Sequence, residues 1–256
     1  MALKILVIHS TSLVGKSTTV ASLLHPRLRN PRIFSVEKQN QDASRYGIEV
    51  VRYNGPDFRT LFDDIVAYPS DLIVDVGASQ YSGVIKEFAR LAGSIDDFDI
   101  VLVPTTPDGR VQEETLGTID TLRKVGMNLE KLRVLFNRAT IDDPSQLDEQ
   151  FEPVIAYLQE HLGLSFYKDL ILYENPIHSE LRAEGLSFEE VARDTTNYRE
   201  KVTEAVRKSP RSAETQALIR MLGLQRAVNS ARIAFDEAFQ ALRLPVVTHP
   251  SVAIEE

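Results

Sequence analysis

Hydrophobic and polar positions alternate in blocks along the first two thirds of the chain. Apolar runs of strand length occur at residues 3–9, 32–37, 48–53, 71–76, 100–104, 132–136 and 170–173. Between them, apolar residues recur every three or four positions, which predicts helices from 15 to about 26 and over 58–65, 84–91, 111–125 and 151–162. Several strands are apolar on both faces, as in a covered parallel sheet. The pattern predicts a doubly wound α/β fold with a mostly parallel sheet and ligands at the carboxyl ends of its strands.

The pattern becomes purely helical after about Ser187. Apolar residues then recur at steps of three or four from Leu218 to Leu242, which predicts one long amphipathic helix over 212–242, with Gly223 as the candidate break. We expect three parts: an α/β domain over 1–192, C-terminal helices over 193–245 that pack on it or at a dimer interface, and a frayed tail over 246–256.

Composition and charge exclude several classes of function. The chain has no cysteine, which excludes disulfides, cysteine-ligated metals and a thiol nucleophile. It carries 29 basic and 37 acidic residues, a net charge of −8, so long-range attraction to nucleic acid is not expected. Arg220, Arg226 and Arg232 share their helix with acids and are interpreted as a solvated face, which leaves direct DNA contact open. No apolar stretch approaches a membrane span, and the first residues read as a strand, so a cytoplasmic location is expected.

The strongest chemical signal lies between the first strand and the first helix. The segment Ser10-Thr-Ser-Leu-Val-Gly15-Lys16-Ser17-Thr18 matches the end of a phosphate loop, with Ser10 in place of the motif's first glycine. Backbone N–H groups of Ser12, Leu13, Val14, Gly15 and Thr18 are predicted to bind phosphate oxygens at the helix N-terminus. Lys16 would reach the β- and γ-phosphates, and Ser17 would place its hydroxyl on Mg²⁺. The segment predicts binding of ATP and Mg²⁺.

Acids at the ends of neighbouring strands complete this predicted site. Asp75 ends the apolar run DLIVD of the strand Asp71–Val76, where a carboxylate would hold Mg²⁺ opposite the loop. Gly77 would either let the backbone approach the γ-phosphate or serve simply as a turn glycine. Glu37 and Asp42 follow the second strand, and either could orient an attacking water. Both could equally belong to a solvated loop.

An asparagine at a strand end and the histidines are further polar candidates. Asn137 ends the strand Leu132–Phe136, where its amide could pair with adenine or simply terminate the strand. Histidines share no spacing typical of a metal site or a catalytic triad, so all are interpreted as structural; they are His9, His25, His161, His178 and His249. The predicted helix over 111–125 places Leu116, Ile119 and Leu122 on one face, which we expect to be buried.

Four segments together resemble the ParA/MinD superfamily of deviant Walker-A ATPases. They are the loop STSLVGKSTT, the strand DLIVDVGAS, the segment VLVPTTPD and the strand LRVLFNR. Within that superfamily the chain is most similar to StbB-type plasmid stability proteins, because the loop has the form x-V-G-K-S-T and is followed by an LxPR-like segment, Leu24–Arg27. The resemblance covers residues 1–192.

The resemblance implies an ATPase that binds ATP and Mg²⁺, forms a homodimer around two nucleotides and hydrolyses ATP slowly. It further implies a role in plasmid partition or positioning, with a small DNA-binding adaptor protein as partner. Lys16, Ser17, Asp75 and Asn137 match the family's phosphate, magnesium and base positions. The family's signature lysine is replaced by Thr11, and its Asp-x-Asp-Pro-Gln pattern is absent, Glu37 being nearest to it.

These departures keep two alternatives open. A small-molecule kinase or ATP-dependent ligase could share the same fold, and it would show ATP turnover stimulated by a metabolite. A nucleotide-binding scaffold without hydrolysis is the other alternative, because Thr11 cannot bring positive charge to a transition state.

Overall fold

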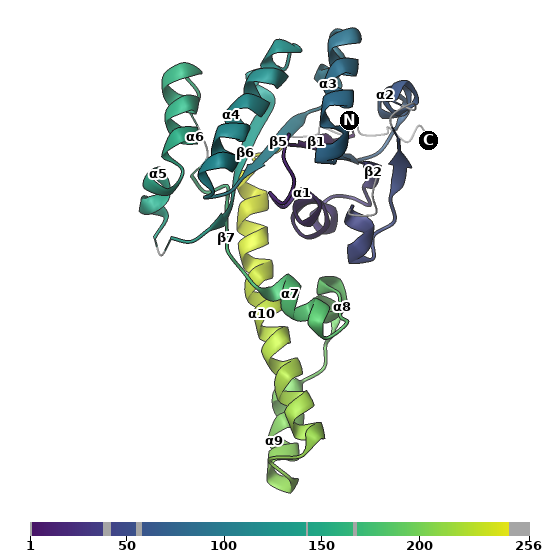
Figure 1. Ribbon diagram of the computed structural model, residues 1–256. Helices are drawn as coiled ribbons and strands as arrows, with labels where there is room; N and C mark the ends of the chain where they lie inside the picture. The colour runs from purple at the N-terminus through teal and green to yellow at the C-terminus, as the bar shows by residue number, and fades with distance from the viewer. Residues whose placement is uncertain (1, 38–41, 55–57, 142, 166–167, 246–256) are drawn as a thin grey trace, which may run out of the picture. The chain divides into compact units, whose positions relative to one another are not determined.

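The computed structural model describes residues 2–37, 42–54, 58–141, 143–165 and 168–245 (Figure 1). The tail predicted over 246–256 lies outside these residues. The described residues form two compact units: 2–173 together with 237–245 make up the first, and 174–236 the second. This division falls between residues 173 and 174, whereas the predicted boundary of the α/β domain lies between 192 and 193.

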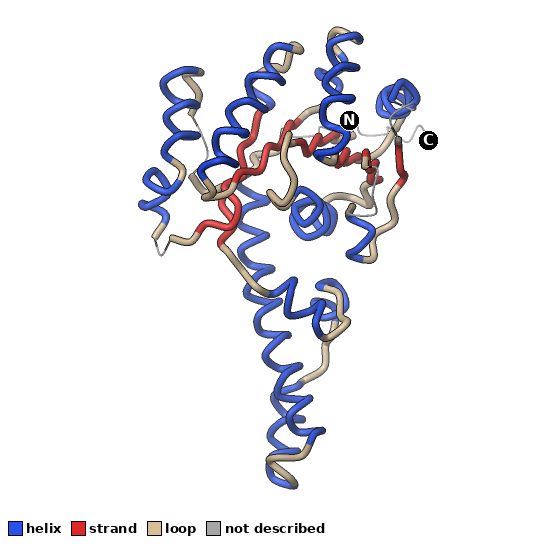
Figure 2. The backbone as a smooth tube through the Cα atoms, in the orientation of Figure 1, coloured by secondary structure: helices blue, strands red, loops and turns tan. Residues whose placement is uncertain are grey.

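A seven-stranded sheet forms the centre of the first unit, in the order β3-β2-β4-β1-β5-β6-β7 (Figures 1 and 2). Every pairing described in it is parallel. This confirms the predicted doubly wound α/β fold with C-terminal helices. Its strands are β1 (Lys4–Ile8), β2 (Arg32–Val36), β3 (Val51–Tyr53), β4 (Leu72–Val76), β5 (Ile100–Thr105), β6 (Leu132–Ala139) and β7 (Ile171–Tyr173).

Helices cover both faces of this sheet because its central strands are apolar on both sides. Residues of β4 and β5 are buried throughout. On one face lie α2 (Phe58–Ala67), α3 (Tyr81–Arg90), α4 (Gly109–Lys124) and α6 (Glu152–Ala156) (Figure 1). On the other lies α1 (Lys16–Thr18), which continues as a π-helix, η1 (Thr19–Leu24), and ends in a 3₁₀ turn, η2 (His25–Arg27). Shorter segments are η3 (Ala43–Tyr46), η5 (Ala78–Gln80), α5 (Leu147–Gln150) and the π-helix η9 (Tyr157–His161).

Aromatic rings dominate the core under α2 and α3. Phe62 and Phe88 meet edge to face at a centroid distance of 5.1 Å, and Phe88 meets Phe98 at 6.3 Å. Such pairs contribute about 0.5–1.5 kcal/mol beyond the area they bury. The predicted apolar spacing of α2 is confirmed, because its buried residues are Phe58, Leu61, Phe62 and Ile65.

The second unit is helical, with α7 (Ile177–Ala183), α8 (Phe188–Arg193), α9 (Tyr198–Lys208) and most of α10 (Ala213–Ala241). The rings of His178, Phe188 and Phe235 form its aromatic cluster. The candidate break at Gly223 is wrong, since α10 runs through it. A helical glycine costs only about 1 kcal/mol, and burial of the neighbouring Leu224 and Val228 outweighs that cost.

The structure also corrects two local predictions. The third strand begins at Val51 rather than at 48, and the helix expected over 151–162 is divided into α6 and η9. In the part of the chain described, no helix combines the length and the apolar character needed to cross a membrane.

Candidate functional site

The predicted phosphate loop joins β1, the central strand, to α1. Gly15 has a φ of 90°, and a Cβ atom there would lie 2.3 Å from Asn137 Nδ2, so only glycine fits. Leu13 also has a positive φ, 65°, although its side chain is 81% exposed. Ser12 is exposed beside it, whereas Val14 is buried. The loop therefore keeps a left-handed backbone at two positions, only one of which is a glycine.

The side chain of Lys16 lies beneath the loop and is almost entirely buried. Its ammonium donates to Thr11 O at 2.6 Å and approaches His9 O at 3.4 Å. Burial lowers the pKa of Lys16 to about 8, although the carboxylates of Asp75 and Glu37 oppose this shift. The ammonium therefore interacts with two carbonyl oxygens of its own loop and with the charges of two acids. A phosphate group bound by the loop would attract this ammonium away from the carbonyl oxygens.

Asp75 lies beside Lys16 on β4, between Val7 of β1 and Ser35 of β2. Its side chain is buried, and among the described residues its Oδ1 atom has no hydrogen-bond partner. Burial raises the pKa of Asp75 to about 6, against the effect of Lys16 and a hydrogen bond from Ser17. A buried carboxylate oxygen without a partner, next to a hydroxyl, fits Mg²⁺, which takes oxygen ligands and retains several waters. No cluster of three acids or histidines that could hold a metal by itself occurs in the described ranges.

Glu37 lies next to the same site, at the end of β2. Ser79 Oγ donates to its Oε1 at 2.5 Å, and Gly77 N donates to Val36 O at 2.9 Å. A Cβ atom at residue 77 would lie 1.8 Å from Glu37 Oε2, so the carboxylate sits directly against Gly77. The structure thus places Glu37 and Asp75 close enough to Lys16 for both carboxylates to act on its charge.

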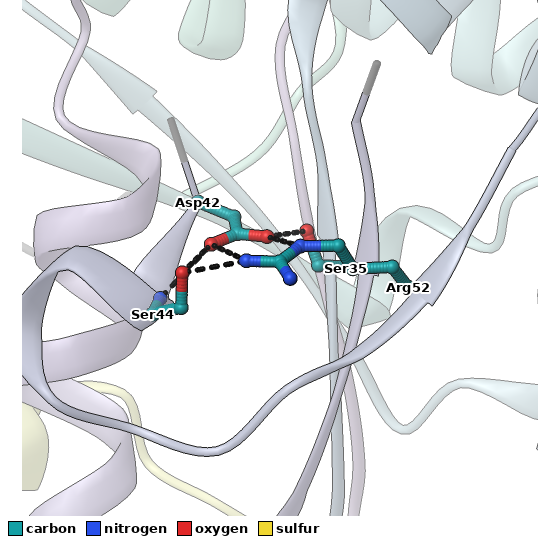
Figure 3. Close-up of polar contacts among 4 residues, drawn as sticks. All are labelled: Ser35, Asp42, Ser44 and Arg52. Carbon is teal, nitrogen blue, oxygen red and sulfur yellow. Dashed lines mark hydrogen bonds and ion pairs between the residues drawn. The ribbon is translucent and has the colours of Figure 1, made fainter. Parts of the chain in front are cut away.

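Asp42, the other candidate acid, is bonded through both of its carboxylate oxygens (Figure 3). Oδ2 accepts from Arg52 Nε at 2.8 Å and from Ser35 Oγ at 3.1 Å, and Oδ1 accepts from Ser44 N at 3.0 Å. Burial would raise the pKa of Asp42, but the bonds from Arg52, Ser44 and Ser35 outweigh it and lower the pKa to about 2. The network fastens η3, whose Tyr46 hydroxyl lies 2.7 Å from Thr18 Oγ1. Asp42 therefore holds η3 in place beside Thr18.

Asn137 lies on the opposite side of the loop, near the end of β6. Its Nδ2 donates to Val14 O at 2.9 Å, and its Oδ1 accepts from Arg138 N at 3.0 Å. In this arrangement the amide holds the phosphate loop. Pairing of Asn137 with adenine stays a prediction.

Sequence reasoning missed a second set of contacts to the loop, made by α4 and His9. His9 is fully buried, and its Nε2 lies 3.0 Å from Thr115 Oγ1. Ser10 N donates to Thr118 Oγ1 at 3.3 Å. The predicted apolar face of this helix is confirmed, because Ile119 and Leu122 are buried and Leu116 packs partly buried against the core; Thr115 and Thr118 are buried as well. The sequence signal that could have predicted these contacts is the pair of threonines three residues apart on one face of the predicted helix.

Other histidines and arginines singled out in the sequence make local contacts within their own unit. His161 stacks on Tyr157, His178 packs on Phe188, and His249 lies outside the described residues. Arg220 approaches Glu184 at 3.7 Å within the second unit, in keeping with a mixed-charge surface.

No family model matches the chain, and no curated protein matches its sequence. Its structure is similar to that of a McdA variant from Cyanothece in complex with ATP, with 12% identity, coverage of 97% of this chain and 99% of that one, and a TM-score of 0.52. It is also similar to the septum site-determining protein MinD with Mg-ADP from Pyrococcus horikoshii OT3 (13% identity, 91% and 99% coverage, TM-score 0.48). A third similar structure is a ParA family ATPase from Chlorobium tepidum TLS (13%, 86% and 98%, 0.48). The likeness to McdA shows the fold alone, a parallel α/β sheet flanked by helices.

Proposed function

We propose that this chain is a nucleotide-switched ATPase of the ParA type, which binds Mg-ATP, dimerises with it and hydrolyses it slowly. The observation that carries the proposal is the grouping of Lys16, Ser17 and Asp75 at the centre of the sheet. Within the described residues, a buried ammonium there lies at hydrogen-bonding distance from loop carbonyls, beside a carboxylate oxygen that has no partner. Such a site is preorganised for an anion that carries a divalent cation.

Each residue of the site has a distinct role in this proposal. Lys16 and the loop N–H groups bind the phosphates, while the Ser17 hydroxyl and the Asp75 carboxylate hold Mg²⁺. Glu37 accepts a hydrogen bond from the attacking water and orients it. When bound, Mg-ATP supplies the γ-phosphoryl group that is transferred to that water.

Thr11 accounts for the slow hydrolysis. Its side chain lies close enough to Glu114 to lower the pKa of that carboxyl, and the residue brings no positive charge to the phosphates. Of the alternatives, this observation favours a nucleotide-binding scaffold without turnover over a metabolic kinase or ligase.

The biological role belongs to the same proposal. By its StbB-type resemblance the protein acts in plasmid stability, partition or positioning, in the cytoplasm, together with a small DNA-binding adaptor protein. The dimer is the switch, because nucleotide bound at the loop favours the paired state.

Sedimentation velocity tests this function, using the wild type and Lys16→Ala with Mg²⁺ and ATP, ADP or no nucleotide. Phosphate release is followed in the same samples, and Lys86→Ala, which changes an exposed lysine of α3, is the control. We expect ATP to convert monomer to dimer in the wild type and the control but not in Lys16→Ala. Dimerisation without phosphate release would support the scaffold. A mass independent of nucleotide, with phosphate release only when a metabolite is added, would overturn the switch.

A further inference from the structure

The first half of the phosphate loop contains no glycine between residues 10 and 14. Ser10 takes the place of the motif's first glycine, and Leu13 holds a positive φ that L residues adopt at a cost. Glycine normally lets such a loop bring its backbone close to phosphate. A loop built from larger residues therefore needs other contacts to hold its backbone in the phosphate-binding conformation.

Helix α4 supplies these contacts to three consecutive loop residues. His9 Nε2 lies 3.0 Å from Thr115 Oγ1, and Ser10 is bonded to Thr118 through both its N–H (3.3 Å) and its hydroxyl (3.0 Å). Thr11 lies close enough to Glu114 to lower the pKa of that carboxyl. The loop residues bonded in this way directly precede the segment that would wrap the phosphates.

The protonation state of His9 follows from its two contacts. Thr11 N–H can only donate, so His9 Nδ1, 3.0 Å away, accepts and carries no proton. The proton of the neutral ring then lies on Nε2 and is donated to Thr115 Oγ1. Thr115 is itself fixed by Val111 O at 2.7 Å and by Thr105 Oγ1 at 2.9 Å. The ring thus forms a rigid link between α4 and the loop backbone.

The same loop residues contact the lysine of the site. Lys16 Nζ lies against Thr11 O and His9 O, so the positions of these two carbonyls set where the ammonium rests. A displacement of residues 9–11 would move both carbonyls and, with them, the ammonium.

We propose that Thr115 and Thr118 are positioning residues for nucleotide binding, which hold residues 9–11 so that a loop without its first glycine keeps the phosphate-binding conformation. The inference rests on the proposed function, because it names a part of that site. It assigns to α4 a role beyond packing against the sheet.

Binding of a fluorescent ADP with Mg²⁺ tests this proposal in the full chain, at a temperature well below unfolding. Thr115→Val and Thr118→Val remove a hydroxyl at nearly constant volume, and each is expected to raise the Kd about fivefold, the equivalent of one hydrogen bond. Thr118→Ser should restore the affinity. Thr121→Val is the matched control, since Thr121 makes the same bond to the preceding turn, at 2.7 Å to Gly117 O, but contacts Tyr81 rather than the loop.

Hydrogen exchange of the amides of residues 10–13 separates positioning from general stability. We expect faster exchange there in Thr118→Val, with exchange in the second unit unchanged. A lower unfolding temperature with unaltered Kd and loop exchange would overturn the proposal. If the wild type binds no ADP, the proposed function is overturned instead. Faster amide exchange of residues 10–13 in Thr118→Val would then still show that α4 holds the loop in place.

Discussion

The two flanks of the phosphate loop are built from different chemistry. On the side of β2 and β4, the charged flank consists of Glu37, Asp42 and Asp75, together with Arg52. On the side of α4, β5 and β6, the neutral flank is formed by the uncharged hydrogen-bonding groups of Thr105, Thr115, Thr118 and Asn137, with the carboxylate of Glu114 beside them. Both flanks contact the loop or the residues beside it.

Burial acts differently on the two flanks. On the charged flank it raises the pKa of Asp75 to about 6 and lowers that of Lys16 to about 8, so both groups titrate near neutrality. Beside the neutral flank, burial and the nearby Lys16 lower the pKa of His9 to about 4, against the attraction of Glu114, and the ring stays uncharged. The charged flank is suited to binding ions and moving protons, whereas the neutral flank is suited to holding the loop at any pH near 7.

The largest effect expected on the charged flank is that of Glu37→Gln on hydrolysis. The amide keeps the shape of the side chain but cannot accept a proton, so phosphate release should fall about 100-fold or more while nucleotide affinity is kept. Single-turnover phosphate release and ADP binding measure the two quantities. Glu49→Gln, at an exposed acid, is the control. Wild-type turnover in Glu37→Gln would remove Glu37 from the chemistry.

Asp42→Ala should distinguish Asp42 from Glu37, because we expect it to lower the stability of the fold and to leave phosphate release unchanged. It leaves the buried Ser35 hydroxyl without its partner, while Arg52, at 43% exposure, regains water. We expect a loss of about 2 kcal/mol in the free energy of unfolding, measured by urea denaturation. The carboxyl's pKa is lowered in the folded state, so this contribution is present above its unfolded pKa and is lost as the pH falls towards 2. Equal free energies of unfolding for the variant and the wild type would show that the hydrogen bonds of Asp42 do not stabilise the fold.

The affinity for Mg-ADP should depend on pH through both groups that titrate near neutrality. Below about pH 6 Asp75 in the free protein gains a proton and no longer favours Mg²⁺, and above about pH 8 Lys16 loses the charge that attracts phosphate. We expect an affinity maximum between these values, with a decrease of about tenfold per pH unit beyond each. Calorimetric titration from pH 5 to 9 measures it. Asp75→Asn should abolish only the decrease in affinity at low pH. An affinity of the wild type that does not change with pH would contradict the roles given to both Asp75 and Lys16.

Asn137→Ala has the smallest expected effect and tests the neutral flank. Loss of the bond to Val14 O should weaken Mg-ADP and Mg-GDP equally, by about fivefold. A loss confined to the adenine nucleotide would instead assign Asn137 to base recognition. Fluorescence competition with the two nucleotides distinguishes the outcomes.

The sequence alone determined the fold class and the centre of the site. Apolar runs at strand spacing and the segment Gly15–Thr18 are local patterns, and the carboxyl ends of parallel strands necessarily meet at one edge of a sheet. Lys16, Glu37 and Asp75 were therefore predictable as neighbours. Local patterns also placed most helices to within a few residues.

Only the tertiary structure decided which polar residues are available for chemistry. Glu37 and Asp42 lie close together in sequence, but Arg52, which follows on the next strand, binds one of them and leaves the other against Gly77. Likewise His9 and Thr115 are 106 residues apart, and their contact exists only because α4 packs beside the loop. Hydrogen bonds and desolvation depend on distances between segments that are remote in sequence. The pattern along the chain therefore indicated the loop and its acids, whereas packing decided which acid is bonded to Arg52 and which lies against Gly77.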